Sequence, residues 1–304
     1  MNIYKICNRL RSRVNTIISE KKLELDREQK PHLTTISIRN RDLKTLNNAN
    51  RRLSQIFKSA PNNPIENHNI FPRDGEKLYV ICMVPRSGST LLGRALASTN
   101  HFGSPGELFN RTKGNTIERS SHRYGAKNLP EYLDMIINVR KTSNNVFGVK
   151  TDYFQLIPFI ATESYRERFN NAKYIYLTRK DVLLQAISRY KGMITSSWES
   201  TTPEKDKAVF NQDKIIDHLN YLVEMMASYE YLFSIHGINP LRICYEDIVQ
   251  DINHVIVKIA DFVGVEYSGK VSLEQLGMKP QATNENVIWR EYIIKKTMEE
   301  KCLF

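Results

Sequence analysis

An apolar run, a short polar turn and a helical pattern follow one another at residues 78–99, LYVICMVPRSGSTLLGRALAST. A turn of small residues between a buried strand and a helix points the unpaired backbone N–H groups of the helix N-terminus at one spot, where they attract an anion. Arg86 adds a planar, permanently charged fork for phosphate or sulfate oxygens. The sequence therefore predicts an anion-binding turn, against the alternative of an ordinary serine-capped helix start. The predicted N–H donors belong to Ser87, Gly88, Ser89 and Thr90.

The turn differs from the phosphate-binding loop of nucleotide hydrolases, GxxxxGK[ST], whose lysine reaches the β- and γ-phosphates. In PRSGST the residue before Ser89 is Gly88, and the turn contains no lysine. This difference disfavours phosphoryl transfer. A nucleotide-dependent small-molecule kinase and a non-catalytic anion-binding protein of the same fold are the two alternative functions.

Strand and helix patterns alternate from Lys77 onward, which predicts an α/β fold with a parallel central sheet and helices on both faces. The turn after the first strand makes this a P-loop-like three-layer fold. We assign residues 71–304 to this domain and residues 1–70 to a basic helical N-terminal extension and linker. The predicted strands are 78–84, 145–150, 172–178 and 241–247, and the clearest helical patterns are 41–57, 181–193 and 213–235.

Positive charge is concentrated in the extension. Residues 1–60 contain 14 Lys and Arg against 5 Asp and Glu, whereas the remaining chain contains 30 against 28. The nearly neutral α/β part argues against a nucleic-acid-binding domain. Residues 1–20 form a basic amphipathic helical pattern, which suits either an anionic membrane surface or packing on the chain's own domain.

The cellular compartment expected from the sequence is the cytoplasm, with residues 1–20 as the candidate contact to the inner membrane face. We find neither a signal peptide nor a run of about 18 apolar residues that would span a membrane. The cysteines show no metal-ligand spacing and no CxxC pair, which fits a reducing compartment. They are Cys7, Cys82, Cys244 and Cys302.

A second anion contact is predicted at residues 174–190, YIYLTRKDVLLQAISRY. Arg179 follows a strand at its carboxyl end, where open α/β sheets bind their ligands. Asp181 suits the N-cap of the next helix, and Gln185 and Ser188 share its face. An exposed polar helix face is the alternative for Gln185 and Ser188.

Several motifs occur together in an order that resembles the bacterial carbohydrate sulfotransferases, a family typified by trehalose 2-sulfotransferase. The resemblance covers residues 78–292. It implies the sulfuryl donor 3′-phosphoadenosine 5′-phosphosulfate (PAPS), a carbohydrate or glycolipid acceptor and no metal requirement. The motifs are PRSGSTLL, GSPGELF, LTRKDVLLQAIS, YEDIVQD and QATNENVIWREY.

The resemblance also implies roles for individual residues. The PRSGST turn, with Arg86 as a catalytic cation, would hold the 5′-phosphosulfate, and Arg179 and Ser188 would hold the 3′-phosphate. Gln281 and Trp289 would close over the donor, although core packing is the default role for a tryptophan. A monomer and a homodimer are both compatible with the sequence.

The resemblance implies that Glu107 in GSPGELF is the general base that takes the proton of the acceptor hydroxyl. The alternative is a capping box, because Ser104 and Pro105 precede Glu107 at the spacing of a helix start. Lys150 matches a family lysine and suits either a site contact or a structural ion pair. Basic residues between 108 and 145 form either an acceptor-facing wall or a solvated loop. They are Arg111, Lys113, Arg119, His122, Arg123 and Lys127.

Overall fold

The structure is a computed structural model. The chain divides into two compact units, residues 1–35 and 36–304, and every described residue belongs to the second. The helix predicted for residues 1–20 therefore lies outside the described residues, which are 40–60, 73–112, 114, 116–196, 206–274, 276–277 and 284–299. Within these ranges no helix is both long enough and apolar enough to cross a membrane.

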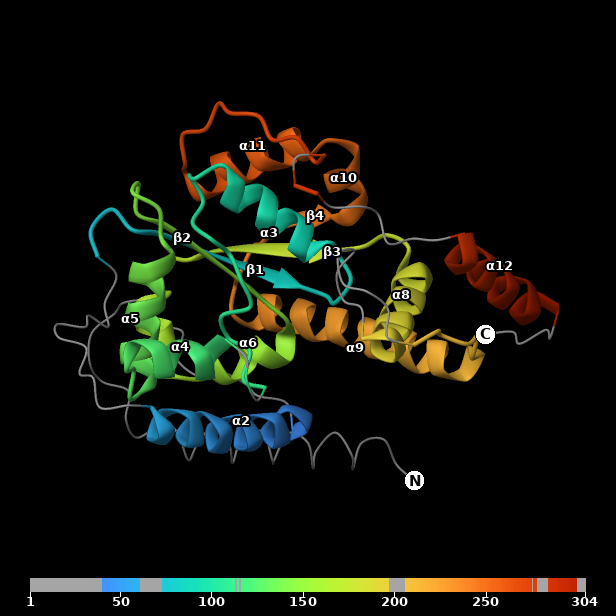
Figure 1. Cartoon of the computed structure of the whole chain (residues 1–304), viewed down its shortest axis with the longest axis horizontal. Coiled ribbons are helices and arrows are strands. Elements are labelled where there is room, and N and C mark those ends of the chain that lie inside the picture. The colour runs from blue at the N-terminus through green and yellow to red at the C-terminus, as the bar shows by residue number, and fades with distance from the viewer. Residues whose placement is uncertain are drawn as a thin grey trace, which may run out of the picture. The chain divides into compact units, whose positions relative to one another are not determined.

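Four parallel strands form the central sheet in the order β2-β1-β3-β4 (Figure 1). This arrangement confirms the predicted α/β class and all four predicted strands. The strands are β1 (Lys77–Met83), β2 (Val146–Thr151), β3 (Lys173–Thr178) and β4 (Leu241–Cys244). The fourth ends three residues before the predicted boundary because helix α10 (Tyr245–Gln250) begins there, with the Asp247 carboxylate accepting a hydrogen bond from the Cys244 N–H at 3.2 Å.

Side chains of β1 alternate between two hydrophobic clusters, as the period of a strand requires. Val80 and Cys82 point into one cluster, and Tyr79 and Ile81 point into the other. Helices α3 (Ser89–Ser98), α10 and α11 (Ile252–Val263) cover the face of Tyr79 and Ile81. The opposite face is covered by α5 (Leu129–Arg140), α6 (Tyr153–Ile160), α7 (Glu163–Arg168), α8 (Val182–Thr195) and α9 (Gln212–Ile235). The result is the predicted three-layer arrangement.

Helix α2 (Asn40–Ser59) extends the layer below the sheet in Figure 1. Its buried residues Leu53, Ile56 and Phe57 recur at helical spacing and join the core cluster beside α4 (Thr116–Tyr124) and α6. The Arg52 guanidinium also pairs with Glu118 of α4 at 2.7 Å. Helix α2, although part of the predicted extension, thus belongs to the compact unit that contains the sheet.

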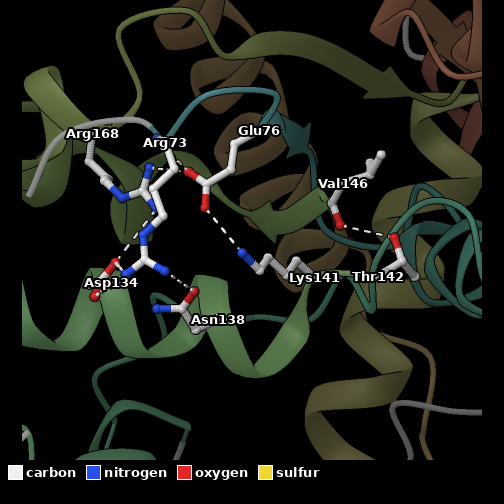
Figure 2. A network of polar contacts seen from close by, with 8 residues as sticks. All are labelled: Arg73, Glu76, Asp134, Asn138, Lys141, Thr142, Val146 and Arg168. Carbon is white, nitrogen blue, oxygen red and sulfur yellow. Dashed lines mark hydrogen bonds and ion pairs between the residues drawn. The ribbon is translucent and has the colours of Figure 1, made fainter. Parts of the chain in front are cut away.

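A charged network lies at the start of β1, at the opposite end of the strand from the PRSGST turn (Figure 2). Arg168 and Glu76 pair at 2.6 Å between Nη1 and Oε2, and both side chains are only 1% exposed. Asp134 lies 3.7 Å from Arg168 and accepts from Arg73 at 3.1 Å, while Lys141 lies 3.5 Å from Glu76. These pairs tie α5 and α7 to the edge where the sheet begins.

Candidate active site

The PRSGST turn follows β1 and leads directly into α3. Arg86 and Gly88 both adopt positive φ angles, 68° and 83°, and Gly88 is the N-cap of α3 with no side chain capping the helix. A Cβ on Gly88 would lie 2.5 Å from the Tyr245 ring, so the position excludes any other residue both by its φ and by this close approach. Ser87 is fully buried, and its hydroxyl finds no hydrogen-bond partner within the described residues. An uncapped helix start of this kind suits an anion.

Arg86 and Ser188 are in direct contact, because the Arg86 Nε donates a hydrogen bond to the Ser188 hydroxyl at 3.0 Å. The two anion contacts predicted from separate motifs therefore form one site. Burial, followed by the nearby charge of Arg179, lowers the pKa of Arg86 to about 10, so Arg86 stays charged at neutral pH. Two cations held this close together favour a ligand with more than one negative charge.

Arg179 lies over the ring of Tyr245, with its guanidinium carbon 4.9 Å from the ring centroid. Its Nε is buried without a hydrogen-bond partner among the described residues, and Glu246 is 3.9 Å away. Tyr245 thus contacts both the turn and Arg179, a role that no local sequence pattern indicates.

Helix α8 begins as predicted, because the Asp181 side chain accepts a hydrogen bond from the Leu184 N–H at 2.8 Å. The alternative of an exposed polar face is wrong for Gln185 and Ser188, since both side chains are buried. Gln185 donates to the Pro85 carbonyl at 2.7 Å and so holds the start of the turn against α8.

Glu107 is positioned by the backbone beside β2. Gly106 forms a parallel bridge with Val149, and the Lys150 N–H donates to the Gly106 carbonyl at 3.0 Å. No helix of the described ranges begins at Ser104, so the capping-box alternative for Glu107 is wrong. Its carboxylate instead accepts hydrogen bonds from Gln155 at 3.2 Å and from Asn110 at 3.3 Å.

Lys150 connects the turn to Glu107. Its Nζ donates to the Thr90 hydroxyl at 3.0 Å and lies 3.8 Å from the nearer Glu107 oxygen. The lysine side chain is 10% exposed, whereas that of Glu107 is 37% exposed and can be reached by a ligand. The sequence places Lys150 at the end of a strand, but only the pairing of β2 with β1 brings it to the turn.

A buried carboxylate, Asp152, lies behind Glu107. It caps α6 by accepting from the Gln155 N–H at 2.8 Å, which places the Gln155 side chain against Glu107. Burial raises the pKa of Asp152 to about 6, and the nearby charge of Glu107 adds to the rise. Arg111 donates to the carbonyls of Phe154 and Gln155 at 2.8 and 2.9 Å, which also holds the first turn of α6.

Three of the basic residues of the expected irregular wall, Arg119, His122 and Arg123, lie on helix α4. His122 of α4 is 2.9 Å from the Ser59 hydroxyl, and the Lys127 ammonium donates to the Ala60 carbonyl. Both contacts hold α2 and the residue that follows it. The interpretation as an acceptor-facing wall is therefore wrong for His122 and Lys127. Lys113 lies outside the described residues.

Trp289 is buried in the core cluster, on helix α12 (Asn284–Glu299). Its ring contacts Phe210 at a centroid distance of 5.5 Å and lies 5.4 Å from the Lys191 ammonium. This is the packing role that is the default for tryptophan. An Arg290–Asp181 pair at 2.7 Å ties α12 to the start of α8. Gln281 lies outside the described residues, so its predicted contact with the donor stays a prediction.

The carboxyl ends of β1, β2 and β3 thus bring together two parts of one site. Arg86, the PRSGST turn, Arg179 and Ser188 form a cationic cradle, and Glu107 lies beside it behind Lys150. An anionic group in the cradle would lie next to a carboxylate that can accept a proton. This is the arrangement needed to move an anionic group onto a hydroxyl.

Comparison with known proteins agrees with this chemistry. The family model described as Stf0 sulphotransferase matches residues 78–293, a range that contains every residue of the cradle and Glu107. The trehalose 2-sulfotransferase of Mycobacterium tuberculosis is 22% identical over 223 residues, which cover 61% of this chain and 84% of the relative.

Two solved structures also match. The sulfotransferase domain from the curacin biosynthetic pathway is 18% identical, with a TM-score of 0.40, and the match covers 64% of this chain and 76% of that domain. A sulfotransferase from Alicyclobacillus acidocaldarius is 13% identical, with a TM-score of 0.44, and the match covers 74% of this chain and 94% of that protein.

Proposed function

The chain belongs to the Stf0 sulphotransferase family and is a sulfotransferase, and on this basis we propose that it transfers a sulfuryl group from PAPS to a hydroxyl of a carbohydrate or glycolipid. The observation that carries the choice of donor is the contact between Arg86 and Ser188, beside Arg179. It gives one site with two cations, as a donor with phosphate groups at both its 3′ and 5′ positions requires. A carbohydrate acceptor is supported by the name of the mycobacterial relative.

In this proposal the turn of residues 87–90 and Arg86 bind the 5′-phosphosulfate, and Arg179 and Ser188 bind the 3′-phosphate. A bond forms between the acceptor oxygen and sulfur while the bond from sulfur to the bridging oxygen breaks. The electron pair of the broken bond leaves with the bisphosphate product, and the acceptor proton goes to Glu107. Arg86 and the N-terminus of α3 stabilise the charge that develops on the leaving phosphate.

The test of the proposed function is a transfer assay with ³⁵S-labelled PAPS and an extract of host glycans and glycolipids, followed by mass spectrometry of the labelled product. We expect label in a sulfated carbohydrate. Turnover of ATP with phosphate transfer would instead support the kinase alternative. Binding of 3′-phosphoadenosine 5′-phosphate (PAP) without transfer to any acceptor would support the non-catalytic alternative.

Arg179→Ala is expected to weaken the binding of PAP by about 1.5–3 kcal/mol, the value of a hydrogen bond to a charged group. Adenosine 5′-monophosphate lacks the 3′-phosphate, so its affinity should change little. Isothermal titration calorimetry with both nucleotides measures the difference. Lys180→Ala is the matched control, because the neighbouring lysine is 68% exposed and pairs only loosely with Asp247, at 3.5 Å. Equal losses for the two nucleotides in Arg179→Ala would rule out the 3′-phosphate contact.

A further inference from the structure

We propose that Arg189 determines the specificity for the acceptor by binding an anionic group, a carboxylate or a phosphate, on the sugar that is sulfated. This inference rests on the proposed function and names the class of its acceptor. Arg189 is a partly buried cation at the end of a row of aromatic contacts that begins beside Glu107.

The Arg189 guanidinium has no acidic partner among the residues that the structure describes. Its Nη1 donates a hydrogen bond to Nδ1 of His218 on α9, so this imidazole nitrogen carries no proton. Burial, followed by the charge of Arg189, lowers the pKa of His218, which is therefore neutral at neutral pH. The carboxylate of Asp217, whose charge reaches His218, pairs with Lys214 at 3.6 Å. A partly buried cation without a counter-charge favours an anionic ligand.

A row of side chains connects Arg189 to the proposed base. The guanidinium carbon lies 4.0 Å from the centroid of the Tyr221 ring, and that ring lies 5.9 Å from the Phe154 ring, centroid to centroid. Phe154 precedes Gln155, whose side-chain amide donates to Glu107 at 3.2 Å. The row forms because α9 packs against both α6 and α8. Phe154, Tyr221 and Arg189 are all partly exposed, so a ligand can reach them.

This row suits a sugar that carries an anionic group. The two aromatic rings offer apolar surface beside the base, as the walls of small-molecule sites commonly do. The guanidinium has five N–H donors, more than its bond to His218 uses, and their planar arrangement matches the oxygens of a carboxylate or a phosphate. A sugar held by its anionic group at Arg189 can place a hydroxyl at Glu107.

The geometry of α8 separates this contact from those to the donor. Ser188 accepts the hydrogen bond from Arg86 in the cradle, whereas the next residue, Arg189, contacts α9. Successive residues of a helix point about 100° apart, so the two neighbours serve different parts of the site. An arginine that bound the donor would affect PAP affinity. An arginine that only held α8 against α9 would not distinguish a charged acceptor from a neutral one.

The test divides the host glycan and glycolipid extract by anion exchange into an acidic and a neutral fraction before the assay with saturating ³⁵S-labelled PAPS. At equal, limiting amounts of carbohydrate, we expect the unmodified protein to label the acidic fraction about tenfold faster or more. Arg189→Met should label the acidic fraction about 10–10²-fold more slowly, the scale of losing a hydrogen bond to a charged group. Its labelling of the neutral fraction and its PAP dissociation constant should stay within about twofold of the original.

Two further measurements define the contact. Arg189→Lys keeps the charge but not the planar fork, so it should retain part of the preference for the acidic fraction. Mass spectrometry of the labelled product then shows whether the anionic group that accompanies the new sulfate is a carboxylate or a phosphate. If Arg189→Met does not fold, Arg189→Gln removes the charge with a smaller change in polarity and carries the same expectation.

Arg242→Met is the matched control. Arg242 also lies over a tyrosine, 5.5 Å from the centroid of the Tyr176 ring, but its charge is paired with Glu230 at 2.6 Å. Its loss should leave the labelling of both fractions unchanged.

The outcomes separate this inference from the proposed function. If the unmodified protein labels the neutral fraction as fast as the acidic one, or if Arg189→Met keeps its rate on the acidic fraction within about twofold, the role of Arg189 is overturned and the function stands. Equal losses on both fractions, or an equal loss of PAP affinity, would also overturn it, because Arg189 would then act on the helices or on the donor. If neither fraction is labelled, the proposed function fails and the inference fails with it.

Discussion

Glu107→Gln is expected to lower the rate of sulfuryl transfer by about 10²–10⁴-fold, the range for loss of a general base, with little change in melting temperature or in PAP affinity. An amide has nearly the shape of a carboxylate, but it cannot take the proton of the acceptor hydroxyl. It still offers an oxygen to the donors that hold Glu107, the side-chain amides of Gln155 and Asn110. The fold around the variant should therefore persist while the chemical step fails.

The measurement is kcat with both PAPS and acceptor saturating, together with calorimetry of PAP binding. Glu131→Gln is the control, because Glu131 is a true helix-start glutamate that accepts from the Lys127 N–H at 2.7 Å in front of α5. That change should leave transfer unaffected and lower stability by at most about 2 kcal/mol, as expected for a capping residue. A Glu107→Gln protein with the original kcat would show that the proton leaves by another route.

Arg168→Met is expected to destabilise the protein by about 3–5 kcal/mol at neutral pH, the cost of removing one partner of a buried ion pair. The two carboxylates around Arg168, those of Glu76 and Asp134, are 1% and 3% exposed and would lose the buried cation between them (Figure 2). Urea denaturation followed by circular dichroism measures the change. Transfer by the protein that remains folded should be unaffected, because the network lies at the opposite end of β1 from the turn.

The loss of stability in Arg168→Met should become smaller as the pH falls. Burial by itself would raise the pKa of Glu76, but the hydrogen bonds from Arg168 and the Arg73 N–H, together with the charges of Arg168 and Lys141, outweigh it. The pKa of Glu76 in the folded protein therefore lies below its ordinary value. The stability that this pair contributes is therefore present above the ordinary carboxyl pKa and is lost as the pH falls through the folded value. The difference between Arg168→Met and the unmodified protein should narrow as the solution becomes acidic.

An exposed ion pair provides the control for the buried pair of Arg168 and Glu76. Arg242 and Glu230 also lie 2.6 Å apart, but they are 55% and 46% exposed, so Arg242→Met should cost no more than about 1 kcal/mol. If Arg168→Met and Arg242→Met lower the unfolding free energy by the same small amount, the buried network does not stabilise the fold in the way its geometry indicates.

The sequence by itself determined the fold class, the strands and the local shape of the turn. Each of these depends on residues close together in the chain. Apolar runs of strand length bounded by polar residues predict β1 and β3, and the small residues of PRSGST predict a turn that leads from β1 into the start of α3. The sequence also predicts Asp181 as an N-cap, because a capping side chain reaches only two or three residues ahead. The ordered motifs also indicated the family that the Stf0 sulphotransferase match confirms.

Only the tertiary structure decided which of these local pieces meet. Arg86 reaches Ser188 across 102 positions of the chain, and Lys150 reaches Thr90 across 60. The same holds for the burial of Trp289 and for the basic residues that hold α2 instead of facing the site. A periodic pattern reports which face of an element is apolar, but it does not report which element packs against that face. Contacts between distant residues depend on strand order and helix packing, so they appear only when the whole core has formed.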